Sequence, residues 1–182
     1  MDKAYGDVTD QMVADREFYL QSIVHRAFKP WLADVELAGV EQGELAREQL
    51  YYVRQAVLQC LHVPGEFWEC GVRSAESAKM IAEMLATAAG TGERRTFRFF
   101  KGLAPMPDAR LAFVHCNLEQ YRSTKECLNH CYARLEKNGM IVVQGYGVPS
   151  SSGVRAAVDE FFSDKREEPL ALSTGPVIVV KL

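Results

Sequence analysis

The sequence predicts an α/β fold, in which a mainly parallel β-sheet has helices on both faces. From residue 66 onward, short apolar segments typical of strands alternate with longer segments of helical periodicity. Glycine and proline residues separate the two kinds of segment. The chain has 182 residues, of which 48% are apolar and 25% are charged, so it can form one domain with a full hydrophobic core.

The N-terminal third is expected to be helical. Thr9–Trp31 and Glu41–Cys60 both carry apolar residues at helical spacing, and a turn at 62–65 follows them. We therefore expect residues 1–62 to form a helical lid or extension, and residues 63–182 to form the α/β domain.

The remaining elements follow from local composition. Each expected strand is a short run of apolar, aromatic or β-branched residues, and these runs are Glu66–Cys70, Thr96–Phe100, Leu111–Cys116, Met140–Gln144, Leu170–Ser173 and Val177–Lys181. The last two should form an antiparallel hairpin. The expected helices are Glu76–Ala89, Thr124–Glu136 and Gly153–Ser163, and Asn138-Gly139 resembles a helix C-terminal stop. In such folds ligands bind beyond the C-terminal ends of the strands.

Charge and hydropathy exclude several classes of partner. The formal net charge is −3, and the Lys and Arg residues are scattered, which argues against nucleic acid and anionic membranes as partners. The N-terminal residues lack the apolar stretch of a signal peptide, and no apolar run approaches the roughly 20 residues of a membrane span. We expect a cytoplasmic protein.

The five cysteines are interpreted as reduced thiols. They are odd in number and lie inside periodic segments, at Cys60, Cys70, Cys116, Cys127 and Cys131. Cys127 and Cys131 are four residues apart on an expected helix, which would allow a zinc site. Because no second ligand pair is evident in the sequence, burial as small apolar residues is the favoured interpretation.

Four sequence elements, in order, resemble those of one enzyme family. They are Val63–Val72, Phe100-Lys101-Gly102-Leu103, Tyr121-Arg122-Ser123-Thr124, and Tyr146-Gly147 with Ala157–Phe161. Together they are similar to the macrocin O-methyltransferase (TylF/MycF) family, which has the Rossmann-like class I methyltransferase fold. Members methylate sugar hydroxyls of natural products with S-adenosylmethionine (SAM) and a divalent metal. The resemblance implies natural-product biosynthesis and a small-molecule substrate.

The residues that match the family's cofactor site depart from its pattern. Its glycine-rich turn is here Gly71–Ser77, where Glu76 places a charge near the expected cofactor. The family's acidic residue for the ribose hydroxyls is matched by Arg98, which cannot accept hydrogen bonds. Glu69 and Gly71 retain the turn, so with Arg98 they are interpreted as a vestigial cofactor site.

The matching metal site is also altered. The family's Asp-x-Asp after the fourth strand corresponds to Asn117 and Glu119, and its Asp-Asp after the fifth strand corresponds to Gln144 and Gly145. Magnesium prefers carboxylate oxygens, of which Glu119 alone remains. We expect neither SAM nor Mg²⁺ to bind tightly, and we assign no metal ligands.

The chain is too short for the family's third strand and its flanking helices. Leu103 and Leu111 are only eight residues apart, and ten loop residues span at most about 33–36 Å. We expect about six strands, with an exposed edge at the second strand. The N-terminal helices or a partner chain, such as a second copy in a homodimer, should cover that edge.

Polar residues at the strand ends are the candidates for function. Glu119, Tyr146 and His115 are the candidate catalytic residues, because carboxylates and imidazoles transfer protons near neutral pH. Asn117, Tyr121 and Gln144 are the candidate substrate-binding residues, because amides and hydroxyls can donate hydrogen bonds to a carbonyl or an enolate. A structural role remains an alternative for each.

Three functions stay open at this point. The first is a cofactor-independent cyclase, isomerase or dehydratase acting on a secondary metabolite. The second is a non-catalytic binding or activator partner of a companion biosynthetic protein. The third is a SAM-dependent O-methyltransferase with a rebuilt site.

Overall fold

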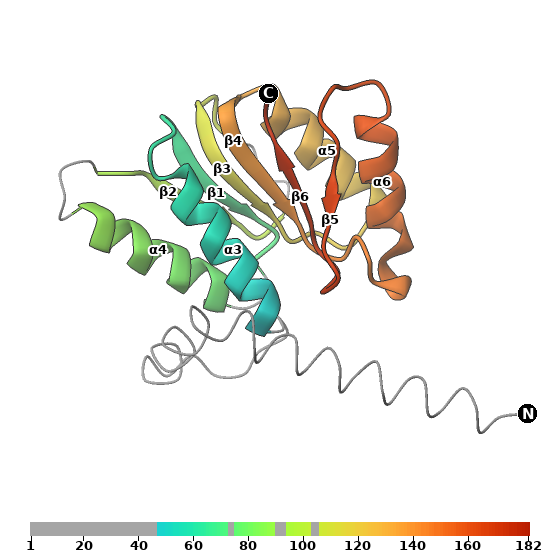
Figure 1. The fold of residues 1–182 in the computed structure, drawn as a ribbon, viewed down its shortest axis with the longest axis horizontal. Helices are drawn as coiled ribbons and strands as arrows, with labels where there is room; N and C mark the ends of the chain where they lie inside the picture. Colours follow the sequence, from blue (N-terminus) through green and yellow to red (C-terminus); the bar gives the residue numbers. More distant parts are fainter. Residues whose placement is uncertain (1–46, 73–74, 90–93, 103–105) are drawn as a thin grey trace, which may run out of the picture. The chain divides into compact units, whose positions relative to one another are not determined.

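One six-stranded sheet organises the computed structural model, which describes residues 47–72, 75–89, 94–102 and 106–182 (Figure 1). The strands are β1 (Glu66–Cys70), β2 (Phe97–Phe100), β3 (Leu111–Cys116), β4 (Leu135–Val143), β5 (Leu170–Ala171) and β6 (Val177–Val180). The helices are α3 (Arg47–Cys60), α4 (Ala75–Ala89), α5 (Tyr121–Tyr132) and α6 (Ser152–Phe162), the last preceded by the 3₁₀ turn η2 (Pro149–Ser151). The predicted helix at Thr9–Trp31 lies outside the described residues.

The strand order is β2-β1-β3-β4-β6-β5. Strands β2, β1, β3 and β4 are mutually parallel, whereas β6 pairs antiparallel with both β4 and β5. This confirms the predicted six-stranded sheet and its closing hairpin, and among the described residues β2 is an edge strand of that sheet. The described residues between β2 and β3, 101–102 and 106–110, contain no helix or strand.

Helices cover both faces of the sheet (Figure 1): α3 and α4 pack on one face, and α5 and α6 on the other. Strand residues alternate between these layers. Trp68 and Cys70 join the core formed with α5 and α6, whereas Glu69 is bonded to Ser77 of α4. All six residues of β3 are buried, as expected for a central parallel strand covered on both sides. The predicted boundary between an extension and an α/β domain at residue 62 stays a prediction, although α3 already contacts β3 and β4.

The predicted end of the helix expected at Thr124–Glu136 was wrong. Helix α5 ends at Tyr132 rather than at Glu136, and strand β4 begins at Leu135. Asn138 does adopt a left-handed conformation, with φ of 66°, but inside an irregular stretch of β4 where the pairing with β3 shifts register. The next residue, Gly139, has a packing reason to be glycine, because a Cβ there would lie 2.8 Å from the carbonyl oxygen of Ala112. Tertiary pairing therefore overrides the local stop signal.

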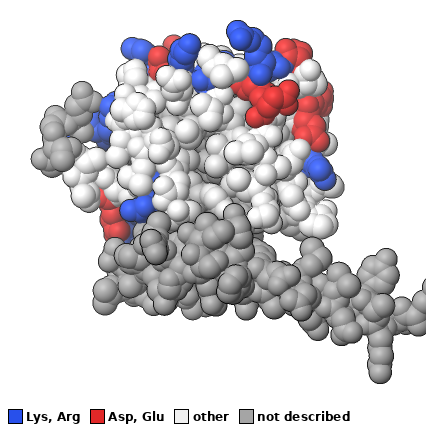
Figure 2. Space-filling model, in the orientation of Figure 1, with Lys and Arg blue, Asp and Glu red and all other residues white. Residues whose placement is uncertain are grey.

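The visible surface separates charged and uncharged regions. Figure 2 shows Lys, Arg, Asp and Glu gathered along the upper margin, with a broad uncharged area beneath. Ion pairs between Arg110 and Glu136 and between Arg134 and Asp108 lie where β3 and β4 begin. At the β2 edge, Phe97 and Phe100 are half-buried, and Phe99 is 60% exposed. In the described part of the chain, no helix is long and apolar enough to cross a membrane.

Candidate functional site

Four buried polar side chains form a connected row across the sheet. The Ser77 hydroxyl donates to Glu69 Oε1 at 2.5 Å, and the same oxygen lies 3.3 Å from His115 Nδ1. Beyond the imidazole, His115 Nε2 is 3.1 Å from Gln144 Nε2. All four residues are at least 95% buried. Burying polar groups is costly unless they bond to one another, and the two hydrogen bonds in this row offset part of that cost.

The parallel register brings this row together. Glu69 of β1 lies directly opposite His115 of β3, and Gln144 follows the last residue of β4. Ser77 belongs to the first turn of α4 and reaches back to β1. Three of the four residues therefore lie at or near the C-terminal ends of adjacent parallel strands, where α/β folds place their ligands.

Both ring nitrogens of His115 face polar groups. When the Gln144 amide nitrogen donates to Nε2, the ring proton is on Nδ1, which lies 3.3 Å from Glu69 Oε1 without a hydrogen bond to it. Within the described residues, Glu69 Oε2, His115 Nδ1 and Gln144 Oε1 are buried without a hydrogen-bond partner. The row thus offers two acceptor oxygens to a ligand or a water molecule that carries a donor.

The turn after β1 is the part of the chain that matches the family's glycine-rich SAM-binding turn. Gly71 has φ of 90°, and a Cβ there would lie 2.7 Å from the carbonyl carbon of Asn117 and 2.8 Å from Leu118 Cδ2. The Asn117 N–H also donates to the Cys70 carbonyl at 2.7 Å. The segment after β3 therefore packs directly on Gly71, which gives this glycine a packing reason independent of any cofactor.

Arg98 does not join the row. Its guanidinium makes a bidentate pair with Glu66, with Nε at 2.7 Å and Nη2 at 3.1 Å from the carboxylate oxygens. Glu66 also accepts from Trp68 Nε1 at 2.7 Å, and the bond from Arg98 lowers the pKa of this carboxyl group. Because Glu66 begins β1, Arg98 is held away from the C-terminal edge of that strand. A cation so placed does not suit ribose hydroxyls.

The counterparts of the metal ligands also do not fit Mg²⁺. Asn117 is half-buried, Glu119 is exposed, and Gln144 is directed at His115. One carboxylate and two amides are a weak donor set for a hard divalent cation. The predicted site residues Glu69, His115 and Gln144 are thus brought together, whereas Glu119 lies on the surface after β3.

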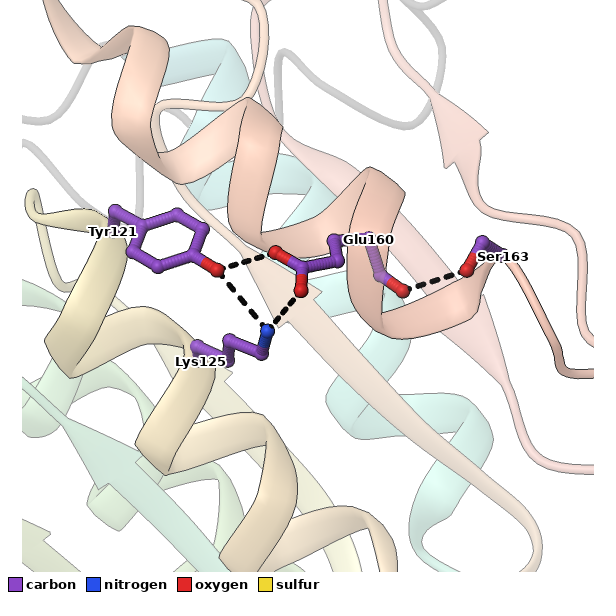
Figure 3. A network of polar contacts seen from close by, with 4 residues as sticks. All are labelled: Tyr121, Lys125, Glu160 and Ser163. Carbon is purple, nitrogen blue, oxygen red and sulfur yellow. Dashed lines mark hydrogen bonds and ion pairs between the residues drawn. The ribbon is translucent and has the colours of Figure 1, made fainter.

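Tyr121 takes part in a different network, between α5 and α6 (Figure 3). Its hydroxyl donates to the Glu160 carboxylate, which also pairs with Lys125, and Lys125 donates to the Tyr121 hydroxyl at 3.0 Å. The pair with Lys125 lowers the pKa of Glu160. Tyr121 is therefore engaged in holding two helices together.

Tyr146 is likewise turned to α6. Its hydroxyl donates to Asp159 Oδ1 at 2.7 Å, and the Arg155 guanidinium lies 5.3 Å from the ring centroid. The bond to Asp159 raises the pKa of the tyrosine. The hydroxyls of both tyrosines bond to α6 and not to the buried row. The candidate residues predicted at the strand ends are therefore only partly brought together.

Two sets of residues were missed by the sequence reasoning. Ser77 could have been found, because it stands at the serine position of the family's Gly-Gly-Ser turn. The tyrosine partners Lys125, Asp159 and Glu160 were not identified, although Asp159 and Glu160 lie in the family-like segment Ala157–Phe161, because the sequence does not show that α6 packs beside Tyr146 and α5.

A surface groove lies at the opposite edge of the sheet. It is lined by residues that precede or begin β3 and β4, namely Asp108, Ala109, Arg110, Ala133, Arg134, Leu135 and Glu136. Its position at the N-terminal ends of the parallel strands separates it from the row of Glu69, His115 and Gln144.

Comparison with known proteins places the fold. No known protein family and no curated protein matches the sequence. Among solved structures, the O-methyltransferase NovP is 18% identical with a TM-score of 0.61, and the match covers 75% of this chain and 80% of NovP. The fold is that of the class I methyltransferases.

Two further structures agree with this. The calicheamicin methyltransferase CalS11 is 14% identical with a TM-score of 0.65, over 94% of this chain and 92% of CalS11. A putative caffeoyl-CoA O-methyltransferase from Staphylococcus aureus is 12% identical with a TM-score of 0.55, over 96% of this chain and all of that one. At such identities the likeness establishes the fold alone, and the resemblance to the TylF/MycF family stays a prediction.

Proposed function

We propose that this protein is a methyltransferase-fold member of natural-product biosynthesis that does not transfer methyl groups, and that it catalyses proton-transfer chemistry on a small secondary metabolite. The observation that carries the proposal is the buried row of Glu69, His115 and Gln144 at the strand ends. It stands where the fold's relatives would hold a cofactor and a metal, and its groups suit acid–base chemistry instead.

The chemistry would centre on the imidazole. Glu69 Oε1 lies 3.3 Å from His115 Nδ1 and would stabilise the imidazolium, while Nε2 would be the atom that accepts a proton. Gln144 covers Nε2 with its amide, so a ligand carbonyl or hydroxyl would displace that amide and receive its hydrogen bond. His115 would then remove a proton beside the carbonyl and return it either to another carbon, giving isomerisation or cyclisation, or to a leaving hydroxyl, giving water and an alkene.

The remaining predicted residues divide into two groups. Glu119, exposed after β3, stays a candidate acid. Tyr146 and Tyr121 are assigned to structure, because their hydroxyls are engaged by Asp159 and Glu160.

Gene replacement in the producing cell tests the proposal. The deleted gene is complemented with wild type, Glu69→Gln, His115→Gln, or the control Glu126→Gln, which alters an exposed carboxylate on α5 that pairs with Arg122. The first two variants should accumulate a precursor that has the product's mass or is heavier by one water, and the control should restore the product. Immunoblotting confirms equal protein levels, so that loss of folding is recognised.

Two results would contradict the proposal. One is an unchanged product profile in both row variants at normal protein level. The other is a precursor that carries a hydrogen where the product carries a methyl group. That result would assign methyl transfer to this chain.

A second function has one observation in its favour. Strand β2 is a free edge in the described sheet, and Phe99 on it is 60% exposed. Edge strands with exposed aromatic residues readily pair with another chain. A non-catalytic companion protein, or a homodimer, would use this edge.

A further inference from the structure

Three cysteine thiols meet in the core, from parts of the chain far apart in sequence. The sulfur atoms of Cys70, Cys127 and Cys131 all lie within 4.8 Å of one another, and each of the three residues is buried. Cys127 Sγ and Cys131 Sγ are 3.9 Å apart. The cluster lies on the α5 side of the sheet, the face opposite to Glu69 and His115.

The fold supplies the ligands that the sequence left unpaired. Cys127 and Cys131 lie one turn apart on α5, so their side chains share one face of the helix. That face packs against the sheet, where Cys70 ends β1. Two further sulfur atoms are nearby: Met106 Sδ is 3.9 Å from Cys70 Sγ, and Cys116 at the end of β3 interacts with Cys127. The lack of a second ligand pair was the sequence-based reason for preferring buried apolar cysteines to a zinc site. That reason therefore no longer holds.

The sulfur spacing matches metal coordination. A Zn–S bond of about 2.3 Å places the sulfur atoms of a tetrahedral or trigonal site about 3.8–4.0 Å apart. The 3.9 Å between Cys127 Sγ and Cys131 Sγ is within that range. Cys70 Sγ lies within 4.8 Å of both, so a small rotation of its side chain would bring it to the same spacing. Thiolate and thioether sulfur are soft ligands that select Zn²⁺ and Cu⁺ over Mg²⁺ or Ca²⁺.

A cysteine binds a metal ion as the thiolate, so an ion that entered this cluster would displace the thiol protons to solvent.

We propose that Cys70, Cys127 and Cys131 form a binding site for a thiophilic cation, Zn²⁺ or Cu⁺, on the α5 side of the sheet. The ion is bound by the three thiolates, and Met106, whose Sδ is 3.9 Å from Cys70 Sγ, is the candidate for a fourth sulfur. Such an ion ties β1 to α5 and therefore acts on stability rather than on the acid–base chemistry proposed for the opposite face.

The test uses the full-length chain, reduced, freed of metal by a chelator and kept without oxygen. It is titrated with Zn²⁺ in one arm and with Cu⁺ in the other, each in competition with a chromophoric chelator of known affinity. We expect one equivalent of one of these ions to bind. We also expect a rise in melting temperature of about 5–10 °C at a hundredfold excess over the dissociation constant.

Matched serine variants separate coordination from packing. Cys127→Ser and Cys131→Ser should lower the affinity at least about 100-fold. Cys60→Ser should leave it unchanged, because Cys60 is equally buried but ends α3 on the other face of the sheet. Where a cluster variant does not fold, alkylation of the wild type followed by peptide mapping replaces it: the ion should protect Cys70, Cys127 and Cys131 from reagent in mild denaturant, and should not protect Cys60.

The proposal is overturned by substoichiometric binding of both ions to the wild type. It is equally overturned if Cys60→Ser weakens binding as much as Cys131→Ser, or if the ion protects all five cysteines alike.

Discussion

Replacing Gly71 with alanine tests whether this glycine serves the packing of two strand ends or the approach of a cofactor. With φ of 90°, the residue is in a region that costs an L-residue about 1–3 kcal/mol. The new Cβ would also lie 2.7 Å from the Asn117 carbonyl carbon, and closer still to its oxygen. Backbone atoms cannot swing away as a side chain can, so overpacking adds about 1–3 kcal/mol. The expected loss is about 2–6 kcal/mol, a large part of the stability of a typical domain.

Urea unfolding followed by far-ultraviolet circular dichroism measures this loss. Gly102→Ala is the matched control, because a Cβ at Gly102 has no atom within 4 Å and its φ is not in the left-handed region. The control should stay within about 0.5 kcal/mol of wild type. If Gly71→Ala were as stable as the control but had lost affinity for SAM, the packing explanation would be refuted.

Three other predictions concern the surface and the helix contacts. Tyr146→Phe should cost about 0.5–1.5 kcal/mol of stability, through loss of the bond to Asp159, and leave the cell's product unchanged; a changed product would return Tyr146 to the catalytic group. Arg98→Gln should lower the urea midpoint at pH 7, and this effect should disappear in acid once Glu66 is protonated in the folded protein. The reason is that the lowered pKa of Glu66 contributes stability above its ordinary value of 4.5 and loses it as pH falls through the folded value; an equal loss at pH 7 and in acid would contradict this. Phe99→Lys should reduce any self-association seen by light scattering while changing stability by less than about 0.5 kcal/mol, and an unaltered molar mass of an associated wild type would exclude the β2 edge as its interface.

The strands were the most predictable part of the fold. The expected bounds of β1 and β3 agree with the structure residue for residue, because continuous apolar runs between turn residues have few alternatives. The end of α5 was not predictable in the same way. Asn138-Gly139 suits a helix stop and a strand irregularity equally well, and only the pairing of β4 with β3 and with Lys181 decides between them.

The candidate site was half predictable for a related reason. His115 and Gln144 could be placed at the same edge of the sheet, because alternating strands and helices give parallel strands whose C-terminal ends share one edge. The direction of a side chain beyond a strand end depends on helix packing, and so Tyr121 and Tyr146 were expected at the site but bond to α6. The thiol cluster shows the same limit, since Cys70 joins Cys127 and Cys131 only when α5 lies on the sheet.

Isothermal titration of the full-length chain with SAM, with and without Mg²⁺, bears most directly on the account. A turn packed by Asn117 and Leu118, an arginine paired with Glu66, and a strand-end amide bonded to His115 predict no saturable heat with either addition. One-to-one binding in the micromolar range would show that the nucleoside is accommodated after all, and would return the chain to the working methyltransferases of its fold.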